Sequence, residues 1–234
     1  MRGYTFHMFT MGFKNYLVMF LKYFIGDFLL VFCILILVFN GRAMIAQARW
    51  NIGQWISQER PTASPSPFTP TSTQAVDPEL RAMIKTVPFT ESKTYIVIAK
   101  IKIIAPVVFP DSLDNVVLLK SLEKGVIKYK DSTQIGEPGT AILLGHSSAY
   151  PWYRGEYGSV FALLEKLENG DQFALTTKNG KTFYYRVDRK QIIIPKDFKI
   201  DIKDGQSHIV LISCWPVRSN KMRMTVWSDL IKVE

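Results

Sequence analysis

Residues 209–216 read IVLISCWP and carry the strongest structural signal in the chain. Four consecutive aliphatic residues, most of them β-branched, are typical of a strand that is buried on both faces. Proline has no amide proton to give to a central ladder, so the strand is expected to end at Pro216. The sequence therefore presents Cys214 at the end of a buried strand, where its thiol faces a surface or a cleft.

Around this strand the sequence predicts a mainly β domain over residues 90–234. Asn179-Gly180 lies between two strand-like runs and is the strongest local signal for a hairpin. Residues 160–167 have helical spacing and stop at Asn169-Gly170. Because there is no βαβ alternation, we expect a closed or nearly closed barrel of about seven or eight strands with one or two short helices. Besides the strand of Cys214, the predicted strands lie at 96–104, 125–129, 140–144, 172–177, 181–187 and 222–227.

The N-terminal region predicts a membrane anchor. Residues 16–39 read YLVMFLKYFIGDFLLVFCILILVF. About 20 apolar residues cross the core of a bilayer, so we expect one transmembrane helix near residues 20–40. A cleaved signal peptide is the alternative, with Ala46-Gln47-Ala48 as its cleavage site, but the apolar stretch is long for a signal peptide. Basic residues flank both sides of the stretch, so they do not orient it.

A proline-rich spacer separates this region from the β domain. Residues 61–70 read PTASPSPFTP, and four prolines with serine and threonine between them exclude a regular helix. Such a composition is typical of an extended, semi-rigid linker. We therefore divide the chain into a tail and anchor over 1–41, a stalk over 42–89 and a β domain over 90–234.

The composition excludes several classes of protein. The formal net charge is +9, and the first 50 residues hold five basic residues against one acidic residue. The remaining excess is diffuse, and no basic run is interleaved with aromatic residues, so no nucleic-acid partner is predicted. Two cysteines are too few for a disulfide framework or a cysteine-rich zinc site. Three histidines leave little material for a metal cluster, and we expect no metal.

Cys214 is the candidate nucleophile, because Cys33 lies in the predicted anchor. The thiolate is the reactive form, and a free pKa of about 8.5 leaves little of it at neutral pH, so a base is needed. His7 precedes the anchor, and His208 lies on the same predicted strand as Cys214, about 20 Å away. His146, which also follows a buried strand, remains as the partner. The alternatives are a structural core cysteine and a surface histidine.

Arg223 is the third candidate. It alternates with Met222, Met224 and Val226, so its side chain leaves the apolar face of its strand. If this strand forms a hairpin with the strand of Cys214, a guanidinium there can hold a peptide carbonyl or a developing oxyanion. A solvated or ion-paired arginine is the alternative. Arg218, in the predicted loop between the two strands, is the alternative arginine for this role, but no strand would hold its side chain in place.

These residues resemble the sortase family, the membrane-anchored cysteine transpeptidases of bacterial surfaces, over residues 92–233. Residues 210–214, VLISC, are similar to the family's Thr-Leu-x-Thr-Cys strand, and Leu144-Gly145-His146 resembles the segment with its histidine. Arg223 resembles the arginine that opens the last strand. Two segments before the histidine, GVIKY at 125–129 and GEPG at 136–139, are also similar to the family. So is one segment after it, FALLEKLENGD at 161–171.

The chain departs from the family motif at two positions. Val210 and Ser213 replace its two threonines, and Ser213 keeps a hydroxyl beside the thiol. Trp215-Pro216 resembles the aromatic–proline pair of the class D, pilin-type and Gram-negative branches more than that of class A.

The resemblance implies a thiol mechanism without a cofactor. Cys214 would attack a carbonyl in a Leu-Pro-x-Thr-Gly-like sorting signal of a secreted protein, and an amine of the cell envelope or of a pilin would resolve the thioacyl enzyme. His146 would transfer protons, Arg223 would hold the signal and the oxyanion, and Ser213 and Trp215 would bind substrate. The resemblance also implies a single-pass protein of the cell membrane with a cytoplasmic tail, an extracytoplasmic stalk and an extracytoplasmic C-terminal domain.

Two other functions stay open. An L,D-transpeptidase also uses cysteine, histidine and arginine on a β scaffold, but its Ser-His-Gly-Cys-x-Arg signature matches poorly at Cys214. A membrane-tethered barrel that only binds a partner would carry Cys214 as an inert core residue.

Overall fold

The computed structural model describes the chain outside residues 1–12, 58–74, 89–92, 150–152, 154 and 200–204. The predicted linker at 61–70 therefore lies outside the described residues. The chain divides into two units, Met1–Gly41 and Arg42–Glu234, each considered by itself.

Helix α1 (Phe13–Ser57) is 45 residues long. Between Val18 and Leu35 it exposes a run of large apolar side chains, such as Phe24 at 57% and Leu30 at 61% of their surface. Among the described residues, no helix is both long enough and apolar enough to cross a membrane, and the transmembrane helix predicted near residues 20–40 is not confirmed.

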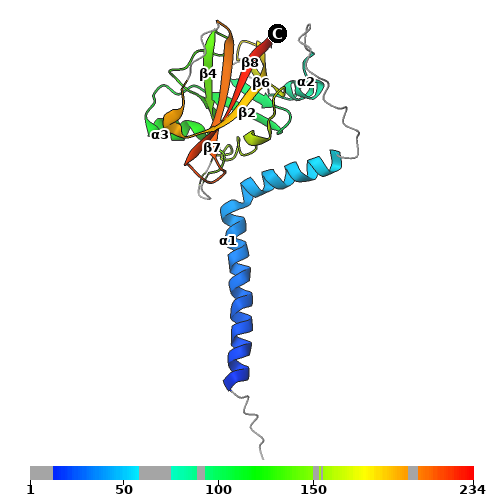
Figure 1. Ribbon diagram of the computed structural model, residues 1–234, viewed down its shortest axis with the longest axis vertical. Coiled ribbons are helices and arrows are strands. Elements are labelled where there is room, and N and C mark those ends of the chain that lie inside the picture. Colours follow the sequence, from blue (N-terminus) through cyan, green and yellow to red (C-terminus); the bar gives the residue numbers. More distant parts are fainter. Residues whose placement is uncertain (1–12, 58–74, 89–92, 150–152, 154, 200–204) are drawn as a thin grey trace, which may run out of the picture. The chain divides into compact units, whose positions relative to one another are not determined.

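The second unit contains a closed barrel of eight strands (Figure 1). The strand order is β1-β2-β3-β4-β7-β8-β6-β5, with β2–β3 and β4–β7 as the parallel neighbours. The prediction of a mainly β barrel is thus confirmed. The strands are β1 (Thr94–Ile98), β2 (Ile103–Val108), β3 (Val126–Lys128), β4 (Gly139–Leu144), β5 (Gln172–Thr176), β6 (Thr182–Ile193), β7 (Ser207–Trp215) and β8 (Met222–Val233).

Two short α-helices follow capped turns. Helix α2 (Pro78–Lys85) starts after Asp77, whose carboxylate accepts the Glu79 N–H at 2.8 Å. Helix α3 (Asn115–Leu122) starts after Asp114, whose carboxylate accepts the Val116 N–H at 2.8 Å. Two 3₁₀ turns, η1 (Leu164–Lys166) and η2 (Pro195–Asp197), complete the described elements.

Two local predictions were wrong. The run at 96–104 is not one strand but the β1–β2 hairpin, because the chain turns at Lys102, whose N–H bonds to the Ala99 carbonyl at 3.0 Å. The helix expected over 160–167 is a series of turns that ends in η1. Its backbone bonds join residues three apart, as in a turn: the Leu164 N–H donates to the Phe161 carbonyl at 3.3 Å and the Lys166 N–H to the Leu163 carbonyl at 2.9 Å.

The barrel interior is built around a stacked aromatic pair. Phe173 and Tyr185 are fully buried and lie parallel, with ring centroids 5.6 Å apart. The Tyr185 hydroxyl accepts the Gly136 N–H at 3.1 Å and lies 3.2 Å from the Ser207 hydroxyl. It therefore ties β6 to the loop before β4 and to the start of β7.

Tyr185→Phe should lower the free energy of unfolding by about 1–3 kcal/mol, because it leaves two partly buried polar groups without their partner. Tyr184→Phe is the matched control on the other face of β6. Its hydroxyl donates to the exposed Glu234 carboxylate at 2.8 Å, which stays hydrated when the bond is lost. We expect a cost of about 1 kcal/mol or less there. Urea unfolding of the full chain measures both, and equal costs would contradict the prediction.

Candidate active site

The hairpin of β7 and β8 places Cys214 and Arg223 directly opposite each other. The antiparallel register pairs these two residues near the open loop, as the sequence predicted. Met224 and Val226 point into the barrel core, whereas Arg223 lines a groove outside it. The alternation expected along this strand is therefore confirmed.

The parallel pairing of β4 with β7 brings His146 to the same end of the barrel. The last pair in register is Leu144 with Ile212, and the Gly145 N–H then donates to the Ile212 carbonyl at 3.0 Å. His146 and Cys214 each follow this pair by two residues. Neighbouring strands are about 4.8 Å apart, so the two side chains leave adjacent strand ends at the same level.

The His146 imidazole is half-buried and packs against an aromatic ring. The edge of one ring meets the face of the other, with the Tyr153 and His146 centroids 5.2 Å apart and the planes at 84°. Nε2 of His146 is buried without a hydrogen-bond partner among the described residues. Burial lowers the pKa of His146 below its usual value, because the imidazolium loses hydration.

Cys214 is half-buried between the two residues predicted to bind substrate. Ser213 is buried and pairs with Met224, which points into the core, and Trp215 donates its indole N–H to the Glu165 carboxylate at 3.3 Å. All three line a narrow gap that has no room for a water molecule. The substrate-binding roles of Ser213 and Trp215 stay predictions.

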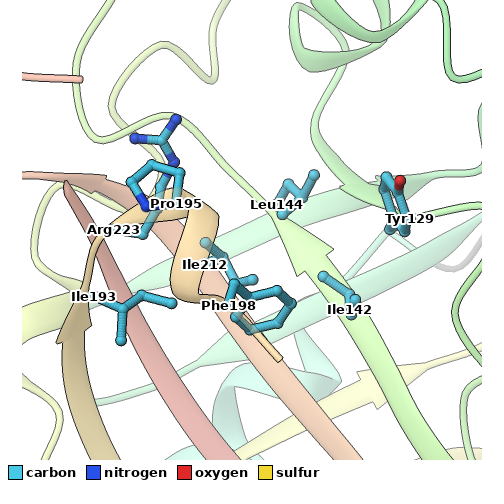
Figure 2. Close-up of a pocket in the computed structure, with 8 residues that line it drawn as sticks. All are labelled: Tyr129, Ile142, Leu144, Ile193, Pro195, Phe198, Ile212 and Arg223. Atoms are coloured by element: carbon cyan, nitrogen blue, oxygen red, sulfur yellow. The ribbon is translucent and has the colours of Figure 1, made fainter. Parts of the chain in front are cut away.

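A larger apolar groove lies on the outer face of the same strands. Its volume is about 240 Å³, and among the described residues that line it Arg223 is the one charged side chain. Figure 2 shows Arg223 and Tyr129 on opposite sides of the groove, with aliphatic and aromatic side chains between them. The lining residues are Tyr129, Ile142, Leu144, Ile193, Pro195, Phe198, Ile212 and Arg223.

The Arg223 guanidinium is anchored at its own turn. Nη1 donates to the carbonyls of Asn220 and Met222, each at 2.9 Å. These bonds fix one nitrogen of the fork at the groove's edge. Sequence reasoning found Arg223 but missed the groove, although the strands of Ile142 and Ile212 are apolar on both faces, which is typical of an outer face that is also covered.

The rival residues lie elsewhere. His208 sits on β7 six residues before Cys214, is 5% exposed, and holds Nδ1 2.8 Å from the Asp229 carboxylate. The expected separation from Cys214 is confirmed. Arg218 lies exposed in the β7–β8 loop, and its backbone N–H donates to the Ser148 hydroxyl at 3.0 Å. Within the described residues, no group of three or more His, Cys, Asp or Glu side chains could hold a metal ion.

Comparison with known proteins gives one family. The family model of the sortase domain matches residues 96–231. Sortase D of Bacillus subtilis strain 168 is 32% identical over 96 residues, which are 41% of this chain and 43% of the relative, less than half its length.

Solved structures show the same fold. Sortase A from Corynebacterium diphtheriae has a TM-score of 0.51 at 23% identity, covering 61% of this chain and 62% of that one. Sortase C1 from Streptococcus agalactiae has a TM-score of 0.51 at 25% identity, covering 63% and 71%. Because the family model spans more than half of the sequence, the chain belongs to the sortase family.

Proposed function

We propose that this chain is a cysteine transpeptidase that cleaves a Leu-Pro-x-Thr-Gly-like sorting signal and transfers the secreted protein to an amine of the cell envelope or of a pilin. Membership of the sortase family supports a transpeptidase role in general. The observation that carries the proposal is the convergence of His146, Cys214 and Arg223 at adjacent strand ends of β4, β7 and β8.

The proposed reaction runs through a thioester. The Cys214 sulfur attacks the carbonyl carbon of the signal, the peptide C–N bond breaks, and the leaving amine takes a proton from His146. An incoming amine then attacks the thioester carbonyl and gives its proton to His146, while the Cys214 sulfur leaves. Arg223 stabilises the oxyanion formed in each step, because its guanidinium carries a full positive charge at the level of Cys214.

The apolar lining of the outer groove supports the proposal that the sorting signal has apolar residues. The groove is lined by aliphatic and aromatic side chains, which suit a leucine and a proline, and Arg223 stands at its edge. A signal lying in the groove would have its apolar residues buried and a backbone carbonyl near the guanidinium. Arg223 pairs with Cys214 across the hairpin, which supports a signal that runs from the groove towards the proposed nucleophile.

Burial of His146 predicts a slow enzyme. The reacting form holds a thiolate and an imidazolium together, and burial disfavours the imidazolium. At neutral pH the imidazolium that would protonate the leaving amine is therefore present in only a minority of molecules. The small size of that fraction therefore limits the turnover rate.

We also propose that the N-terminal helix is a single-pass membrane anchor and that the barrel lies outside the cytoplasm. The exposed apolar side chains of α1 support this proposal, since such a surface is unfavourable in water. A sorting signal on a secreted protein is also accessible only on that side.

The first prediction concerns the cysteine and the histidines. The assay uses Leu-Pro-x-Thr-Gly peptides with a glycine amide as acceptor. Cys214→Ala should show no transfer, and the transfer rate of His146→Ala should be at least about 100-fold below that of wild type. His208→Gln is the matched control and should stay within a few-fold of wild type, although it loses the contact with Asp229. Intact mass should show a thioacyl adduct on Cys214. Transfer by Cys214→Ala would end the proposal.

The second prediction concerns the planar guanidinium. Arg223→Lys should lower kcat/KM by about 100-fold, because a point charge cannot reproduce a fork that binds its own turn and the oxyanion together. Arg218→Lys, in the adjoining loop, is the matched control and should change kcat/KM little. An equal loss in the two variants would show that a guanidinium is needed at either position, and would contradict a specific role of Arg223.

The third prediction concerns topology. In cells expressing the full chain, the protein should sediment with membranes, and protease added to intact cells or spheroplasts should digest the barrel. A cytoplasmic marker protein should survive the same treatment, and lysed cells should lose both. Survival of the barrel in intact spheroplasts would contradict an extracytoplasmic domain.

A further inference from the structure

Tyr153 is held between the candidate base and another part of the fold. Its ring edge-packs with His146 at 5.2 Å, and its hydroxyl donates to the Leu122 carbonyl at 2.7 Å, at the end of α3. One side of the residue therefore contacts the imidazole, while the other is tied to the last turn of a helix. Neither contact has a role in the mechanism described above.

The contact between the rings of Tyr153 and His146 affects both the orientation and the protonation of the imidazole. A ring pair at this distance and angle lies in the favourable range for aromatic side chains, and it limits rotation of the imidazole. Nε2 of His146 is buried and has no partner among the described residues, so no protein acceptor stabilises a proton on this nitrogen. Removing water from an imidazole without supplying an acceptor favours its neutral form.

We propose that Tyr153 is a positioning residue that fixes the orientation of the His146 ring and keeps it neutral in the resting site. Its importance for turnover rests on the proposed transpeptidase function, whereas its effect on the protonation of His146 does not. The lowered pKa of His146, caused by burial, agrees with this role. The bond to Leu122 gives the ring a fixed place, because it is anchored to the backbone at the end of α3 rather than to a mobile side chain.

Several other titratable groups lie on the surrounding elements among the described residues, including Glu165 in the gap beside Cys214. Cys214 on β7 and Arg223 on β8 lie at the same strand ends, Glu123 follows α3, and Glu156 and Tyr157 share the segment of Tyr153. Burial is the one cause of the lowered pKa of His146, so none of these charges competes with it as the cause. Removing the Tyr153 ring should therefore change the protonation of His146 more than changing any nearby charge.

The test measures His146 protonation directly in the full chain. The sequence holds three histidines, so nuclear magnetic resonance spectra of histidine-labelled protein are assigned with His7→Gln, His146→Gln and His208→Gln. In wild type, the pKa of His146 should lie below the ordinary value of about 6.5. Tyr153→Ala should raise it towards that value, whereas Tyr153→Phe, which keeps the ring, should leave it low.

Kinetics give the second readout. Tyr153→Ala should lower kcat by about tenfold to 100-fold, because the loss of one fixed orientation of the imidazole outweighs the larger imidazolium fraction that a higher pKa gives. The KM for a Leu-Pro-x-Thr-Gly peptide should change little, and the acidic limb of the pH–rate profile should move to higher pH. Tyr129→Ala is the matched control: it removes a tyrosine from the groove, so KM should rise while the pKa of His146 stays unchanged.

The outcomes separate the two proposals. If Tyr153→Ala leaves the pKa of His146 unchanged, or if Tyr153→Phe raises it equally, the role of Tyr153 is wrong, whatever the activity. If wild type transfers no peptide but Tyr153→Ala raises the pKa, the positioning role holds and the transpeptidase proposal fails.

Discussion

The parallel ladder between β4 and β7 is the constraint on which the candidate site depends. Six consecutive residue pairs hold the two strands in register up to Leu144 and Ile212. Both strands are apolar on both faces, so a shift by one residue would exchange the barrel core with the outer cluster. The ladder of six pairs holds this register, and the register sets His146 and Cys214 at one level.

The two faces of these strands serve different purposes. The inner face fills the barrel, where the stacked rings of Phe173 and Tyr185 lock the interior. The outer face forms an apolar groove with Arg223 at its edge. Because side chains alternate along a strand, the packed core directly supports the groove on the outer face. Cys214 and Arg223 lie on these strands, and His146 follows the end of β4 by two residues.

The imidazole environment sets the chemical character of the site. Burial favours a neutral His146, which can accept a proton, and it disfavours the imidazolium that would protonate a leaving amine. A thioester intermediate suits such a site, because it divides the transfer into two steps and lets an amine compete with water.

The sequence by itself determined the mainly β class, the strand of Cys214 and the outward side of Arg223, because period-two alternation and a terminal proline act locally. It did not reveal the β1–β2 turn at Lys102, the turns at 160–167 or helix α3, whose members include no buried residue to mark a face. Only the tertiary structure decided that β4 lies parallel to β7, that a groove forms between Tyr129 and Arg223, and that Tyr153 covers His146. These features join segments far apart in the chain, and no local pattern encodes which strands become neighbours.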